Sequence, residues 1–125
     1  MKLNLDCVRS VLLAVEGKPL GKPLTVENLK AITKFSEEDI IYTCLKLDEA
    51  GFLEVITIPI QRQLFPGIKS VNELTFQGHE FLETIRPDDV WDNTKAKLKK
   101  LGSFSLGIIQ SVASSVLSSK IQELF

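Results

Sequence analysis

The sequence predicts a mainly helical fold of the α+β class, in which one β-hairpin interrupts a series of helices. Apolar residues recur every three or four positions through residues 3–15 and 40–47, which is the spacing of helices buried on one face. Residues 52–58 and 71–75 are instead rich in β-branched and other strand-forming side chains, and a Pro-Gly turn signal separates the two runs. We therefore expect helices first, then a hairpin, then helices again.

Length and composition set the broad class. The chain has 125 residues, of which 44% are hydrophobic and 25% charged, as in a single folded domain of ordinary size. No apolar run approaches the roughly 20 residues that cross a bilayer. Asp6 and Arg9 interrupt the region where a secretion signal needs an apolar core, so we expect a cytoplasmic protein. Cys7 and Cys44 lack ligand spacing and favour buried thiols, with a disulfide as the alternative.

The first two helices are separated by a turn-rich connector. Residues 3–15 form the first helix, which Gly17 can end by adopting a left-handed conformation. Residues 18–23 contain two prolines and a glycine, which break the helical pattern. The Thr25 hydroxyl can then cap a second helix over residues 26–34.

A third helix leads into the hairpin. Ser36 can cap a helix over residues 37–50, and Gly51 follows its last periodic residue. The first strand begins directly afterwards at residues 52–58, and the second returns at residues 71–75. The long connection between them contains the turn signal.

Two phrases in this region resemble the winged helix-turn-helix superfamily. "LKLDEAGFLEV" is similar to the end of that superfamily's third helix as it passes into the first wing strand. "ELTFQGHEFLETI" is similar to the second wing strand followed by a further helix. The resemblance implies a winged-helix domain over residues 1–86 with a two-stranded wing. Residues 87–125 then form a C-terminal extension of two helices.

The whole chain also resembles an uncharacterised family of phage and prophage proteins (domain of unknown function 2513). The likeness lies in the opening "MKLNLDCVRSVLL", the middle "LTFQGHEFLETIRPDDVWDNTK" and the tail "KLKKLGSFSLGIIQSV". It implies a winged-helix-like core in a phage-encoded protein. It brings no activity, so no functional residue is carried over.

The sequence offers no convincing catalytic or metal site. His79-Glu80 matches the first half of the zinc-hydrolase pattern HExxH, but Glu83 occupies the position of the second histidine. His79 is the only histidine, and no glycine-rich phosphate loop is present. We therefore expect no enzyme, no cofactor and no metal, with His79 and Glu80 in the first turn of a helix.

Charge is distributed unevenly around the predicted wing and third helix. Residues 1–35 carry a net +3, residues 36–86 a net −5 and residues 87–125 a net +1. The predicted solvent face of the third helix holds three acids and one base: Glu38, Asp39, Tyr42, Thr43, Lys46 and Glu49. Those acids oppose phosphate binding, which supplies most non-specific affinity for nucleic acids.

Double-stranded DNA is nevertheless the expected partner, contacted mainly through the wing and the second helix. The expected DNA-binding residues are Tyr42, Thr43 and Lys46 on the third helix, Arg62 and Lys69 on the wing, and Lys30 and Lys34 on the second helix. The function so predicted is a phage or prophage transcription regulator. The alternative is a winged helix that binds another protein, since a fold does not determine a function.

The last helix has an apolar arc and a weakly charged opposite side. Its apolar residues are Leu106, Ile109, Val112, Ala113, Val116, Leu117, Ile121 and Leu124. This arc favours a homodimer, with the contact expected at Leu106, Ile109, Ala113, Val116, Leu117 and Leu124. Packing back onto the same chain is the alternative. Adsorption to a membrane surface is disfavoured, because Lys120 is the helix's only cation.

Overall fold

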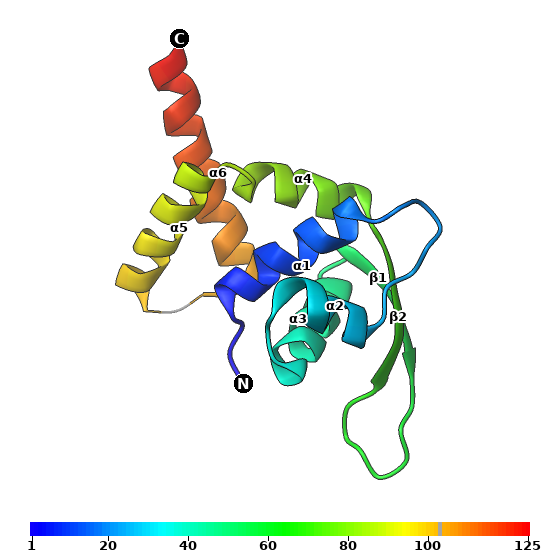
Figure 1. Cartoon of the computed structure of the whole chain (residues 1–125). Coiled ribbons are helices and arrows are strands. Elements are labelled where there is room, and N and C mark those ends of the chain that lie inside the picture. The colour runs from blue at the N-terminus through cyan, green and yellow to red at the C-terminus, as the bar shows by residue number, and fades with distance from the viewer. Residues whose placement is uncertain (103) are drawn as a thin grey trace. The chain divides into compact units, whose positions relative to one another are not determined.

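A computed structural model describes residues 1–102 and 104–125 and shows a mixed α+β fold that is mostly helical (Figure 1). Its elements, in order, are α1 (Leu5–Gly17), α2 (Val26–Thr33), α3 (Glu37–Glu49), β1 (Leu53–Ile58), β2 (Gly67–Leu74), α4 (Phe76–Ile85), α5 (Asp88–Leu101) and α6 (Leu106–Leu124). The chain forms two compact units, Met1–His79 and Glu80–Phe125. The predicted class and order of elements are confirmed.

Two helices of the first unit, α2 and α3, begin at the predicted polar caps. The side chain of Thr25 accepts a hydrogen bond from the Asn28 amide at 3.1 Å, and the Asn28 side chain accepts one from the Thr25 amide at 3.0 Å. The Ser36 hydroxyl accepts from the Asp39 amide at 3.2 Å and starts α3 in the same way. These bonds satisfy amides that have no partner within the helix, which is why short polar residues begin both helices.

The two strands form an antiparallel hairpin whose base is tied to the helical connector. Figure 1 shows β1 and β2 side by side. Leu53 pairs with Leu74 at the base of the hairpin, and Val71 of β2 also forms a bridge with Leu24. The Glu73 carboxylate pairs with Lys18 and accepts a further hydrogen bond from the Gly21 amide. The connector between α1 and α2 is therefore held against β2 by backbone and ionic contacts together.

The start of α4 packs its backbone closely against the segment just before β1. The Thr75 hydroxyl donates to the Gly51 carbonyl and accepts from the Gly78 amide. Gly78 lies inside α4, where a Cβ atom would overlap the Phe52 carbonyl oxygen. Glycine is needed here because the backbones of α4 and of the segment just before β1 approach too closely for a side chain.

The second unit contains a helical pair, α5 and α6. Asp89 at the start of α5 pairs with Lys120 near the end of α6, so the helices run antiparallel. Helix α5 begins at Asp88 after Pro87, whose side chain makes no cap hydrogen bond, and the Asp89 carboxylate accepts a hydrogen bond from the Val90 amide at 3.0 Å. Trp91 is buried. The left-handed Gly102 ends the helix.

Candidate functional site

The exposed face of α3 differs from the predicted one at Thr43. This residue is only 1% exposed, and its hydroxyl lies beside the Cys7 thiol. The predicted exposure of Thr43 on the DNA-facing side of α3 is therefore wrong. Packing of α3 against both α1 and α2 buries a wider arc than a single apolar stripe implies.

Lys46 lies on the exposed face of α3, but its side chain interacts with two residues of the same helix. Its ammonium group pairs with Glu49 at 3.0 Å and lies 5.5 Å from the centre of the Tyr42 ring. The hydrogen bond to Glu49 raises the pKa of Lys46. The cation expected to attract DNA is thus locally neutralised, and Tyr42 is half-buried beneath it.

The other predicted DNA-binding cations lie on separate elements. Lys30 of α2 pairs with Glu27 at 3.4 Å, whereas Lys34 is exposed and ends that helix in a left-handed conformation, with φ of 67°. Arg62 at the hairpin tip and Lys69 on β2 are also exposed. Lys34, Arg62 and Lys69 are thus accessible to a partner. The structure does not gather these cations around α3.

An apolar groove lies where the sequence predicted the DNA-reading surface. Its volume is about 430 Å³, and α3 supplies most of its lining, with one residue from the hairpin loop and the first residue of the chain. The lining residues are Met1, Glu38, Ile41, Tyr42, Leu45 and Phe65. The sequence assigned Ile41 and Leu45 to the buried stripe, but both are only partly buried and form the groove. Sequence reasoning missed this feature.

The hairpin adds further exposed apolar surface next to that groove residue. Phe65 is 52% exposed and Leu64 is fully exposed, although turns and loops are usually rich in polar residues. Ile56, Ile58 and Ile60 are each 40% exposed or more. The apolar character of residues 58–66 was the one sequence signal that could have indicated a contact surface here.

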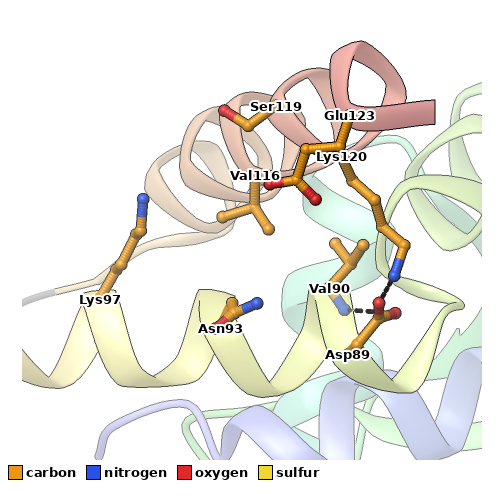
Figure 2. A pocket seen from close by; sticks show the side chains of 8 residues that line it. All are labelled: Asp89, Val90, Asn93, Lys97, Val116, Ser119, Lys120 and Glu123. Atoms are coloured by element: carbon orange, nitrogen blue, oxygen red, sulfur yellow. Dashed lines mark hydrogen bonds and ion pairs between the residues drawn. The ribbon is translucent and has the colours of Figure 1, made fainter. Parts of the chain in front are cut away.

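The second unit carries a different groove, between α5 and α6 (Figure 2). Its volume is about 280 Å³ and its lining is polar, with Asn93 and Lys97 on α5 and Ser119 and Glu123 on α6. Figure 2 shows the Lys120 ammonium group directed at the Asp89 carboxylate, an ion pair that spans the two helices. These opposite charges are largely exposed and balance each other, so this groove has no evident chemical preference.

Most of the residues predicted to form a dimer contact are not available for one. Leu106, Ile109, Ala113 and Val116 are buried within the single chain, which contradicts their predicted exposure to a second copy. The apolar stripe of α6 faces α5, with which α6 makes extensive contacts. This is the alternative arrangement, in which α6 packs back onto its own chain. Leu117 is half-buried and Leu124 is 71% exposed. A homodimer stays a prediction.

The reactive side chains of the first unit are dispersed or buried. Cys7 and Cys44 are both buried free thiols, and burial raises the pKa of Cys44 to about 12. In residues 1–102 and 104–125, no three His, Cys, Asp or Glu side chains are grouped so that they could hold a metal ion.

None of the helices in the described residues is long and apolar enough to pass through a membrane.

Comparisons with known proteins identify the family. An uncharacterized protein of Haemophilus influenzae (strain Rd) is 33% identical over 126 residues, which cover 94% of this chain and 97% of that protein. No solved structure matches the chain. The family described as hypothetical protein DUF2513 matches residues 2–105. By both measures, the chain belongs to the DUF2513 family.

Proposed function

We propose that this protein is a non-enzymatic protein-interaction module, built on a winged helix-turn-helix core, that binds a partner protein at the groove between α3 and the hairpin tip. The order of α1, α2, α3 and the hairpin supports the winged-helix assignment. The observation that carries the proposal is the apolar groove of about 430 Å³ on the exposed side of α3.

The chemistry of this surface suits a protein better than a nucleic acid. The centres of protein interfaces are apolar and rich in aromatic residues and Met, and this groove is lined by Tyr42, Phe65 and Met1. The first turn of α3 carries three acids, Glu37, Glu38 and Asp39. Those carboxylates would repel DNA phosphates from the same surface.

Site-specific photo-crosslinking tests the proposal. The photoreactive amino acid p-benzoylphenylalanine is placed at position 65 in bacteria that carry the gene, and irradiation should join the protein to one defined partner. The same label at position 54, an exposed site on β1 outside the groove, serves as the control. The identified partner should then bind the purified protein, and Phe65→Ser should weaken that binding. Crosslinks only to nucleic acid, or an identified partner that binds Phe65→Ser equally well, would contradict the proposal.

A second candidate function is a phage or prophage DNA-binding regulator that acts in the cytoplasm. It is favoured by one observation: within the described residues, no carboxylate pairs with Lys34, Arg62 or Lys69, and all three are exposed. Cations of this kind are free to contact phosphates through the wing and second helix.

A mobility-shift titration on a mixed-sequence duplex tests the DNA candidate. Arg62→Ala and Lys69→Ala should each weaken binding and lower the slope of log affinity against log salt by about one. Lys46→Ala, which removes a cation already paired with Glu49, serves as the matched control. No shift of any duplex at low salt would exclude this candidate.

A further inference from the structure

The geometry of the α3 groove points to the chemistry of its partner. We propose that the groove binds an amphipathic segment of another protein, in which a large aliphatic or aromatic anchor is followed by Lys or Arg at the end that meets the start of α3. This inference rests on the proposed protein-interaction function. Beyond that function, it specifies the class of segment that the groove binds and the direction in which the segment lies.

The apolar part of the groove fits side chains rather than a whole folded surface. Ile41 and Leu45 lie one helical turn apart on α3, with Tyr42 beside them, and Phe65 contributes from the hairpin tip. A volume of about 430 Å³ is within the range of pockets that enclose small apolar ligands. Helical segments bind such grooves by inserting side chains spaced at three or four positions. One or two anchors are therefore the expected occupants.

Among the described residues, the one acidic side chain in the groove lining lies at the start of α3. Glu38 lines the groove and is exposed, and Glu37 precedes it in the first turn of α3. Within residues 1–102 and 104–125, neither Glu37 nor Glu38 pairs with a cation. These acids stabilise the start of the helix through its dipole, and their carboxylates, without an ion-pair partner in the described part of the chain, lie beside an apolar surface. A basic group on the partner would complement them.

The opposite end of α3 carries an ion pair that closes within the helix itself, between Lys46 and Glu49. The groove-lining carboxylate of Glu38, which has no ion-pair partner among the described residues, lies at the start of α3. This difference between the two ends gives a bound segment a preferred direction. DNA is disfavoured because the acids repel phosphates. A second copy inserting the exposed end of its own α6 is also disfavoured, because that end carries Glu123 beside Leu124.

Three synthetic helical peptides test the inference on the full-length protein. The first has Leu and Phe anchors followed by Lys, the second has the same anchors followed by Glu, and the third has Lys but Ser in place of the anchors. Binding is followed through the amide resonances of the isotope-labelled protein. The Lys peptide should shift the resonances of Ile41, Tyr42 and Phe65. The Glu peptide should bind at least roughly tenfold more weakly, and the Ser peptide should produce no shifts; tenfold corresponds to about 1.4 kcal/mol.

Paired variants separate the apolar contribution from the charge contribution. Phe65→Ser should weaken binding of the Lys peptide, whereas Leu64→Ser, an exposed neighbour outside the groove lining, should not. Glu38→Gln should reduce the preference for Lys over Glu peptides. Glu54→Gln makes the same change in net charge outside the groove and should leave the preference intact. Salt should weaken the Lys peptide more than the Glu peptide.

The outcomes distinguish the inference from the function on which it rests. Equal binding of the Lys and Glu peptides, both weakened by Phe65→Ser, would overturn the basic segment and leave a protein-docking groove. Shifts of the groove resonances only on adding duplex DNA, or only on raising the protein concentration, would overturn the inference in favour of DNA or a second copy. No shift with any peptide would overturn both the inference and the proposed function.

Discussion

The apolar surfaces of α3 and α6 had opposite expectations and opposite outcomes. The stripe on α6 was expected to contact a second copy, yet Ile109 and Ala113 are fully buried within one chain. Ile41 and Leu45 of α3 were instead assigned to a buried stripe, yet they line an open apolar groove. The comparison shows that apolar content alone does not locate an interface. What matters is whether the chain itself supplies a helix to cover the stripe, as α5 does for α6.

The largest effect should come from truncating the α6 stripe. Ile109→Ala removes a fully buried side chain and should lower the free energy of unfolding by about 2–5 kcal/mol. Leu124→Ala, on the same helix but 71% exposed, should change it by about 0.5 kcal/mol or less. Urea denaturation of both variants measures the difference. Equal, small effects together with dissociation of a dimer by Ile109→Ala would restore the intermolecular interpretation of the stripe.

A second effect should appear at the close approach of helix and strand beneath the hairpin. Gly78→Ala places a Cβ atom against the Phe52 carbonyl and should cost about 1–3 kcal/mol of stability. Gly17→Ala is the matched control, because its added Cβ meets nothing within 4 Å and alanine favours the helix that it ends. Thermal unfolding compares the two. A neutral Gly78→Ala would show that the hairpin base can move away from α4.

A smaller effect, visible through its pH dependence, should come from the Lys18–Glu73 ion pair. The hydrogen bond from Lys18, with that from Gly21, holds the pKa of Glu73 below its ordinary value of 4.5. Folding therefore favours the ionised carboxylate, so the stabilisation is complete above pH 4.5 and is lost as the pH falls through the lower folded pKa. Glu73→Gln should be less stable than the parent at pH 7 and should match it in strong acid. A stability difference that does not change with pH would contradict this role.

The smallest effect on stability should come from the groove itself. Phe65→Ser removes a side chain that is 52% exposed on a loop, and it should alter the free energy of unfolding by about 0.5 kcal/mol or less. Stability measured by urea denaturation should thus stay constant while partner binding falls. A large loss of stability would show that Phe65 packs for the fold rather than for a partner.

The fold could be predicted from the sequence to a greater extent than the site. Thr25 and Ser36 were recognised as helix caps because capping depends on residues three positions away, and both make the expected bonds. Thr43 was misplaced because its burial depends on α1 and α2, which helical periodicity on α3 does not report. Lys46 was correctly placed on the surface, but its pairing with Glu49 and Tyr42 depends on side-chain conformations.

Local sequence patterns were sufficient to predict the order of the helices, the hairpin and the helix caps. The sequence also showed that no second histidine follows His79 at metal-ligand spacing. Each depends on neighbours a few residues apart, where periodicity and capping chemistry operate. The three-dimensional arrangement alone decided that the α6 stripe is covered by α5. It also decided that Phe65 joins Ile41 and Leu45 in one groove, although some 20 residues separate the loop from the helix. The reason is physical: burial and surface charge belong to surfaces, and surfaces exist only after distant segments pack.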